Sequence, residues 1–170
     1  MSQFKEIKVS ELPFSPFELK EKWMLISAEK EGKINTMTAS WGGLGIFWNK
    51  EVVFVVIRPQ RYTKEFVDNA ENFSLTFFDD SYKKQLSYLG RVSGRDENKI
   101  ETAGLSIVSE DNIPFFEEAE TVIFAKKLYS QPTGEEFFID KSIIGKWYPE
   151  KDFHTLYFAE ITKIMVKNNN

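Results

Sequence analysis

Short runs of apolar, β-branched and aromatic residues dominate the hydrophobic pattern of this chain. Trp23–Ala28 and Ile34–Ser40 are two such runs, and the Glu31-Gly32-Lys33 sequence between them is typical of a tight turn, so the pair predicts a β-hairpin. Val52–Ile57 is an unbroken apolar run, which predicts a strand covered on both faces. Phe73–Phe77 alternates apolar and polar side chains, the pattern of a half-buried strand.

Two longer strands and three helices complete the predicted elements. The strands are expected at Thr121–Tyr129 and Thr155–Val166, where β-branched and aromatic residues are frequent. The helices are expected where apolar residues recur at helical spacing: Thr63–Ala70, with Thr63 as its N-terminal cap, Tyr82–Leu89, and Glu97–Ala103, which Gly104 ends.

Strands outnumber helices in this pattern and do not alternate with them as in βαβ units. The sequence therefore predicts a mainly β fold with peripheral helices, arranged as a closed or nearly closed antiparallel barrel. A dinucleotide-binding fold is disfavoured, because Gly42-Gly43-Leu44-Gly45 lacks the third glycine of the fingerprint and Trp48 stands in its place. We find no internal repeat or linker, so residues 1–170 are expected to form one domain, with a core at about 17–166 and short terminal arms.

Composition narrows the class of protein further. The 170 residues carry a net charge of −4, no cysteine and one histidine, which argues against nucleic-acid binding, disulfides and thiolate or histidine metal sites. The N-terminus lacks a signal pattern and no run approaches the roughly 18 apolar residues of a membrane span, so we expect a cytoplasmic protein without a membrane partner. Aromatic residues make up 15% of the chain, more than a core of this size needs to hide, and this excess predicts a homodimer.

The densest group of candidate binding residues follows Val52–Ile57 and opens the first predicted helix. Arg58, Arg61, Tyr62 and Thr63 bring two guanidiniums, a phenol and a hydroxyl to a helix N-terminus, whose free N–H groups favour an anion. Arginine presents paired donors to phosphate oxygens, which lysine does not. One interpretation is a phosphate-binding cradle. The alternative is a solvated turn, in which Thr63 only caps the helix and the arginines pair with nearby acids.

A second candidate lies in the segment 35–43, where a strand gives way to glycines. Thr38 and Ser40 are expected on the same side of the strand, where they would offer two hydroxyls to one edge of a ligand. The glycines would let backbone N–H groups approach a planar or anionic partner closely. The alternative is a strand end with a β-bulge.

A third candidate is the loop that contains Ser93, Gly94 and Arg95 between two predicted helices. Its hydroxyl, its flexible glycine and the charged pair Arg95–Asp96 could close over a ligand. The alternative is that Arg95 and Asp96 only stabilise the loop. The run Gly90–Gly94 is not the G-x-S-x-G turn of hydrolases, because its serine is displaced by one residue. The acidic stretch Glu110–Glu120 is expected to be a solvated face.

His154 opens the last predicted strand and is the one side chain that titrates near neutral pH. It could hydrogen-bond a cofactor or a nicotinamide, or protonate a reduced ring. The alternative is a structural role, in which the imidazole packs between Phe153 and Trp147 or bonds the backbone.

Taken in order, these segments resemble the flavin reductase-like, FMN-binding split-barrel family, in particular its flavoredoxin-like branch. The resemblance spans roughly residues 23–160 and implies a six-stranded Greek-key split barrel, a homodimer, and FMN held non-covalently near the subunit interface. The matching pieces are NTMTASW at Asn35–Trp41, RPQRYT at Arg58–Thr63, NFSLTF at Asn72–Phe77, SGRDENK at Ser93–Lys99, and the strand from His154 to Glu160.

The resemblance also implies roles for individual residues. Leu89 stands where members of the family often have a cysteine, so no thiol role is expected, and Asn98 stands where similar members usually have an acid. His154 is set beside the cofactor. The remaining roles fall to three groups: Thr38, Ala39, Ser40 and Trp41 would line the flavin, Arg58, Arg61, Tyr62 and Thr63 would hold its phosphate and ribityl end, and Ser93, Gly94 and Arg95 would close the site.

Three functions are compatible with this interpretation. The leading one is an oxidoreductase in which NADH or NADPH reduces bound FMN and the reduced flavin passes electrons to an acceptor; the chemistry then belongs mainly to the cofactor. The second is a non-catalytic FMN electron carrier that a redox partner protein reduces. The third is a barrel that only binds or stores flavin.

Overall fold

The computed structural model of the protein describes residues 3–168. The strands are β1 (Phe4–Ile7), β2 (Met24–Lys30), β3 (Lys33–Ala39), β4 (Gly42–Phe47), β5 (Lys50–Ile57), β6 (Asn72–Phe77), β7 (Ile107–Glu110), β8 (Ile113–Phe116), β9 (Thr121–Pro132) and β10 (Thr155–Lys167). The α-helices are α1 (Leu19–Lys22), α2 (Tyr62–Asn69), α3 (Lys83–Arg91), α4 (Lys99–Thr102) and α5 (Ser142–Trp147).

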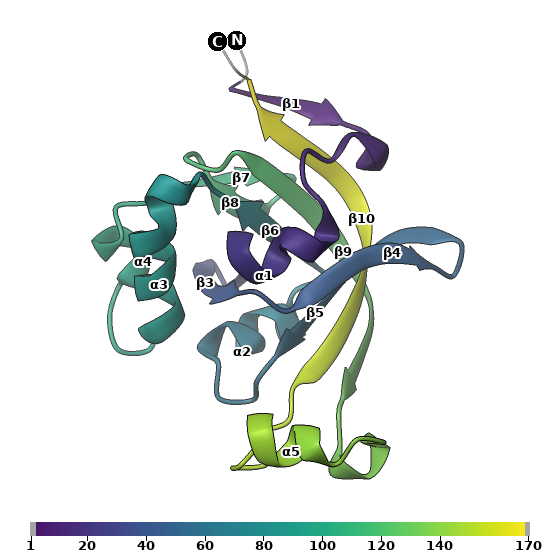
Figure 1. Cartoon of the computed structure of the whole chain (residues 1–170). Helices are drawn as coiled ribbons and strands as arrows, with labels where there is room; N and C mark the ends of the chain where they lie inside the picture. The colour runs from purple at the N-terminus through teal and green to yellow at the C-terminus, as the bar shows by residue number, and fades with distance from the viewer. Residues whose placement is uncertain (1–2, 169–170) are drawn as a thin grey trace.

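An antiparallel sheet of eight strands forms the body of the molecule (Figure 1). Seven strands follow the order β3-β2-β6-β9-β10-β5-β4, and β1 pairs with β10 beyond the end of β5. Within residues 3–168, no hydrogen-bonded ladder joins the edge strands β3 and β4, so the barrel stays open. The mainly β class with peripheral helices is confirmed, and all six predicted strands are present.

Two-residue turns with positive φ close three hairpins. They are Glu31-Gly32 between β2 and β3, Trp48-Asn49 between β4 and β5, and Asp111-Asn112 between β7 and β8. Positive φ at both central positions matches the right-handed twist of the flanking strands. The first hairpin is the predicted one, whereas Trp48-Asn49 has no glycine to mark it in the sequence.

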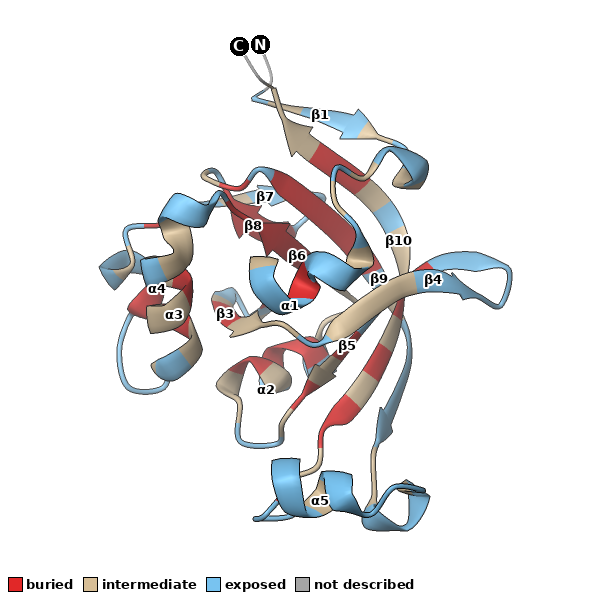
Figure 2. Ribbon diagram, in the orientation of Figure 1, coloured by how far each residue is buried: buried red, intermediate tan, exposed pale blue. Residues whose placement is uncertain are grey.

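The strands separate two hydrophobic cores. Met24, Ile26 and Ala28 of β2 face the interior of the barrel, and Leu25 between them joins a second core under α3 and α4. This alternation follows from the two-residue period of a strand. Both sides of β2 are therefore buried, and Figure 2 shows the buried residues concentrated on β6, β8 and β9.

The prediction that Val52–Ile57 is covered on both faces holds only in part. Val53 and Val55 are fully buried in the barrel, and Val52 is buried on the opposite face, but Phe54 on that face is 36% exposed. The helices and β8 pack on the other part of the sheet, near β2 and β6, and leave the outer face of β5 to aromatic side chains.

The prediction that Phe73–Phe77 is half-buried is also wrong, because β8 packs on β6. Ser74 Oγ donates to the Pro114 carbonyl at 2.5 Å, and Thr76 Oγ1 donates to the Leu25 carbonyl at 3.3 Å. The polar side chains of β6 thus reach acceptors while buried, as buried hydroxyls generally do.

Two further segments differ from the sequence expectation. Glu117 and Glu120 are exposed as predicted, but Ile113–Phe116 within the same acidic stretch is the buried strand β8. The N-terminal arm is structured from residue 4, because β1 pairs with residues 164–167 of β10.

The three predicted helices are found as α2, α3 and α4, with one correction. Thr63 does not cap α2, since the helix begins at Tyr62 and Arg61 is the N-cap residue. Gly104 follows α4 with a φ of +68°, the left-handed conformation that ends many helices. No helix among residues 3–168 is both long and apolar enough to cross a membrane.

Candidate functional site

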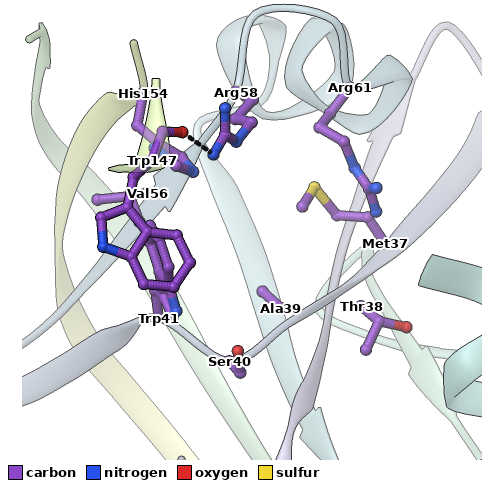
Figure 3. Close-up of a pocket in the computed structure, with 10 residues that line it drawn as sticks. All are labelled: Met37, Thr38, Ala39, Ser40, Trp41, Val56, Arg58, Arg61, Trp147 and His154. Atoms are coloured by element: carbon purple, nitrogen blue, oxygen red, sulfur yellow. Dashed lines mark hydrogen bonds between the residues drawn. The ribbon is translucent and has the colours of Figure 1, made fainter. Parts of the chain in front are cut away.

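A cavity of about 220 Å³ opens where the ends of β3 and β5 meet the start of β10. Figure 3 shows Arg61 and Met37 on one side of it, and Trp41, Trp147 and His154 on the other. The residues that line it are Met37, Thr38, Ala39, Ser40, Trp41, Val56, Arg58, Arg61, Trp147 and His154.

The structure brings seven of the predicted site residues to this cavity. They come from three distant parts of the chain: Thr38, Ala39, Ser40 and Trp41 at the end of β3 and just after it, Arg58 and Arg61 before α2, and His154 before β10. Arg58 and His154 meet because β5 lies beside β10. The segment at the end of β3 joins them because it leads directly into β4, which pairs with β5.

Five predicted residues lie elsewhere. Thr63 is buried, and its hydroxyl accepts a hydrogen bond from Asn35 Nδ2 at 2.9 Å. Tyr62, Gly94 and Arg95 line a separate groove, of about 600 Å³, between α2 and the loop before α4.

That loop is held by contacts of its own, as the alternative interpretation expected. Arg95 pairs with Glu65, and its guanidinium lies 4.5 Å from the Tyr62 ring centroid. Ser93 Oγ accepts from the Arg95 backbone N–H at 3.2 Å. Gly94 is required here for space, since a Cβ would collide with the side-chain oxygen of Asn35.

Arg61 is the cation of the cavity that no acid compensates. Its guanidinium donates to the Gly90 carbonyl at 2.7 Å, and burial lowers its pKa. Among residues 3–168, no carboxylate forms an ion pair with it. The buried Lys99 adds positive charge nearby: its pKa is lowered to about 8 by burial and then by Arg61, while Nζ donates to the Leu89 and Val92 carbonyls at 2.9 Å.

Arg58 differs from Arg61, because its charge is already compensated. It forms an ion pair with Asp152 and donates to the Trp147 carbonyl at 2.8 Å. Its guanidinium also lies 5.0 Å from the centroid of the Tyr148 ring. Arg58 therefore ties the cavity to the connection between β9 and β10. The expected pair of free guanidiniums is reduced to one.

The two hydroxyls of the strand end are not equivalent. Thr38 Oγ1 donates to the Leu86 carbonyl of α3 at 2.5 Å, and in Figure 3 it points away from the other lining residues. Ser40 lies on the floor of the cavity in the same view, one residue beyond the end of β3. Both residues line the cavity, but the Thr38 hydroxyl already donates to the protein, so Ser40 is the one whose hydroxyl remains for a ligand.

His154 lies at the aromatic end of the cavity. Its ring centroid is 5.3 Å from that of Trp41, and its Nδ1 lies 2.8 Å from the Tyr148 hydroxyl. Burial and then Arg58 lower the pKa of the imidazole to about 4. The ring is neutral at pH 7, which favours a hydrogen-bonding role over proton donation.

The aromatic end continues onto the outer face of the sheet. Trp41 and Trp147 meet edge to face at 5.1 Å and are 39% and 43% exposed. Beyond them lies an aromatic ridge on the β4–β5 hairpin and its neighbours, with ring centroids 4.1 to 6.1 Å apart. The aromatic ridge consists of Phe47, Trp48, Phe54, Tyr129 and Phe158.

The aromatic ridge and the cavity share one face of β5. Phe54, Phe158 and Tyr129 stand opposite one another on β5, β10 and β9. Val56 lines the cavity two residues after Phe54, so both side chains leave the strand on the same side.

A second cavity, of about 210 Å³, adjoins the first on the side of α3. Both share Thr38, Ala39 and Ser40 in their walls, and the second adds Trp23 and Arg91 among its lining residues. Each is smaller than the roughly 300 to 1,000 Å³ of typical ligand sites. A ligand of nucleotide size would extend beyond either one.

Sequence reasoning missed Tyr148, Asp152 and Lys99, and gave Trp147 only as a packing neighbour of His154. Trp147, Tyr148 and Asp152 belong to the connection between β9 and β10, which carries no motif and reaches the cavity only through the fold. Lys99 stands at the end of the SGRDENK run, but its use as a buried donor to the carbonyls after α3 depends on the packing of α4.

The structure thus combines an open antiparallel barrel with a cavity that has a cationic side and an aromatic side. The chain belongs to the family of the flavin reductase like domain, whose model matches residues 18–170. The resemblance noted from the motifs is thus confirmed.

Solved structures of this family share the fold. An FMN-binding domain of a flavin reductases-like enzyme from Shewanella baltica superposes with a TM-score of 0.71 at 17% identity, covering 96% of this chain and 77% of that one. The flavoredoxin of Desulfovibrio vulgaris gives 0.66 at 20% identity, with coverages of 86% and 69%. An FMN-binding protein from Thermus thermophilus, solved with bound p-hydroxybenzaldehyde, gives 0.67 at 19% identity, with coverages of 94% and 79%.

A sequence relative is similar over part of the chain. An uncharacterised protein of Aeropyrum pernix is 30% identical over 103 residues, which cover 59% of this chain and 39% of that protein. The matched stretch therefore spans less than half the length of that relative.

Proposed function

We propose that the protein binds FMN in the described cavity and acts as an oxidoreductase that passes electrons from NADH or NADPH through FMN to an acceptor. The observation that carries the proposal is Arg61, a partly buried guanidinium in the cavity wall with no acidic partner among residues 3–168. A buried charge without a counter-ion is costly. The phosphate of a flavin mononucleotide would compensate it.

The donor set of the cavity fits FMN at both ends. Arg61 would hold the phosphate, with Lys99 adding positive potential from behind the α3 carbonyls. Ser40 and the backbone around it would meet the middle of the ligand. Trp41 and His154 would border the ring system. When bound, FMN supplies reversible one- and two-electron chemistry at that ring.

A homodimer belongs to the same proposal. A mononucleotide would extend beyond the cavity of one copy of the chain, whose open side continues into the aromatic ridge. A second copy packed on the ridge would bury these exposed rings and cover the mouth of the cavity together. Large exposed apolar patches commonly mark such interfaces. The cytoplasmic location expected from the sequence stays a prediction.

The residues of this chain would bind and orient the flavin and exclude water from it. His154 is neutral at pH 7, so it would offer a hydrogen bond and not a positive charge. Arg58 would not bind the flavin directly. Its hydrogen bond to the Trp147 carbonyl would hold the indole of Trp147 in place at the cavity wall.

Calorimetric titration with FMN, riboflavin and FAD tests the binding half of the proposal. FMN is expected to bind most tightly, because its terminal phosphate monoester concentrates close to two negative charges on one group, whereas each phosphate of the FAD pyrophosphate carries one. Equal affinities for FMN and riboflavin would contradict the assignment of Arg61.

Anaerobic addition of NADH or NADPH to the FMN-loaded protein tests the catalytic half. Bleaching of the flavin absorbance within seconds is expected with one of the nucleotides. A flavin that stays oxidised with both, but bleaches with dithionite, would replace the reductase by the electron carrier that a partner protein reduces.

A further inference from the structure

Tyr148 and His154 form a buried polar pair behind the aromatic end of the cavity. The phenol oxygen and Nδ1 of the imidazole are 2.8 Å apart, and each residue is 8% exposed. The two rings meet edge to face with centroids 5.5 Å apart. The His154 carbonyl accepts from the backbone N–H and the hydroxyl of Thr133, at 2.9 and 2.7 Å, so the imidazole is held from both its backbone and its ring.

Two charged groups lie beside the pair. Arg58 covers the Tyr148 ring, and Asp152 is bound to both Arg58 and Gln60. The carboxylate is thus occupied by other donors, and the guanidinium disfavours a second positive charge on His154. A neutral imidazole carries a single ring proton, on either Nδ1 or Nε2.

The hydrogen bond to Tyr148 decides between these two tautomers. If Nδ1 donated to the phenol oxygen, the phenol proton would be left without an acceptor among residues 3–168. If the phenol donates to Nδ1, the phenol proton is paired and the proton of the imidazole is on Nε2. No side chain or carbonyl among residues 3–168 accepts from Nε2, but His154 lines the open cavity, where solvent or a ligand can accept this proton. Buried polar hydrogens are nearly always paired, so the second arrangement is favoured.

We propose that Tyr148 is a positioning residue that holds His154 as the Nε2–H tautomer. The side of the imidazole left for the cavity is then a hydrogen-bond donor. The ligand atom that meets it must be an acceptor, such as a carbonyl oxygen on a planar ring. Only the identity of that ligand rests on the proposed function; the tautomer is a property of the protein alone.

His154 is the only histidine of the chain, so its ring nitrogens can be observed without ambiguity. A long-range ¹H–¹⁵N correlation spectrum of the ligand-free protein at pH 7 is expected to show a pyridine-like Nδ1 and a pyrrole-like Nε2. A phenol proton resonance coupled to Nδ1 is expected as well. A pyrrole-like Nδ1 in the wild-type protein would overturn the proposal, and this result needs no variant.

The variant Tyr148→Phe removes the donor and keeps the ring. Its phenol resonance should disappear, and the two nitrogen shifts should move toward each other as both tautomers become populated. Tyr82→Phe is the matched control, because that ring packs on Phe78 in the second core and its spectrum should equal the wild type. An unchanged His154 spectrum in Tyr148→Phe would show that the phenol does not set the tautomer.

Ligand additions identify the acceptor. FMN is added first, and a nicotinamide nucleotide is then added to the FMN-loaded protein under anaerobic conditions. The addition that moves the Nε2 proton downfield is the one whose carbonyl meets His154. If FMN binds by fluorescence quenching and neither addition moves this proton, the acceptor part of the proposal is wrong. Absence of any FMN binding would instead count against the proposed function and would leave the tautomer assignment decided by the ligand-free spectra.

Discussion

Replacing Arg61 with alanine should abolish the preference of this protein for FMN over riboflavin. In the structure, Arg61 is the cavity cation that lacks an acidic partner among residues 3–168, whereas Arg58 is paired with Asp152. The two arginines lie three residues apart in one motif, so their sequence context predicts similar roles. Their tertiary contacts predict different ones.

The magnitude follows from the contact that would be lost. A hydrogen bond between charged groups contributes about 1.5–3 kcal/mol, which corresponds to roughly 10- to 150-fold in affinity. Arg61→Ala should therefore weaken FMN by that factor and leave riboflavin nearly unchanged. Arg58→Ala should weaken both flavins by similar factors, because it releases the Trp147 backbone and leaves Asp152 without its counter-ion.

Calorimetric titration of each variant with FMN and with riboflavin gives the ratio of the two affinities, and this ratio shows which arginine holds the phosphate. Arg95→Ala is the matched control, since that guanidinium pairs with Glu65 and lies outside the cavity. Circular dichroism and melting curves confirm that each variant is folded. A ratio that falls in Arg58→Ala and persists in Arg61→Ala would refute the assignment of the phosphate to Arg61.

Three further predictions concern pH and assembly. The pKa of His154 is about 4 in the folded protein and 6.5 in the unfolded chain, so the unfolded state binds more protons between these two values. The free energy of unfolding, measured by urea titration, should therefore fall as the pH drops from 6.5 to 4. The fall should be smaller in His154→Gln. The pKa of Lys99 falls from 10.5 to about 8 on folding, so the wild type should gain stability relative to Lys99→Met as pH rises from 8 toward 10.5; a constant difference would contradict the burial of its charge. Trp48→Lys on the aromatic ridge should lower the mass measured by light scattering from dimer to monomer at micromolar concentration, and a wild-type protein that is already monomeric would contradict the homodimer.

Much of the barrel could be predicted because its signals are local. Glu31-Gly32 marks a hairpin, and the runs that became β5, β6, β9 and β10 are rich in β-branched and aromatic residues. These local signals do not show which other element of the fold covers each face of a strand. Ser74 and Thr76 look solvent-facing by alternation, and only the packing of β8 shows that they are buried.

The candidate site was predictable to the same extent. The runs at 38–41 and 58–61 stand at strand ends, and they meet at the cavity because the first leads into β4, which pairs with β5, and the second follows β5. The run at 93–95 has the same kind of composition but lies in a separate groove, since α2 stands between. The contribution of Trp147 and Tyr148 had no sequence signal, because it depends on a connection that folds back toward Arg58.

The connection between β9 and β10 explains how one cavity can have two chemically different ends. It delivers Asp152 to Arg58 and so cancels one of the two positive charges of the motif. It also places Tyr148 behind His154 and Trp147 in front, which makes that end neutral and aromatic. Arg61 keeps its charge uncompensated because the one hydrogen bond of its guanidinium among residues 3–168 is to the Gly90 carbonyl. A ligand with an anionic tail and a planar, carbonyl-bearing head fits such a cavity in one orientation. Its tail lies at Arg61 and its head at the aromatic end, because the connection between β9 and β10 pairs Arg58, and not Arg61, with an acid.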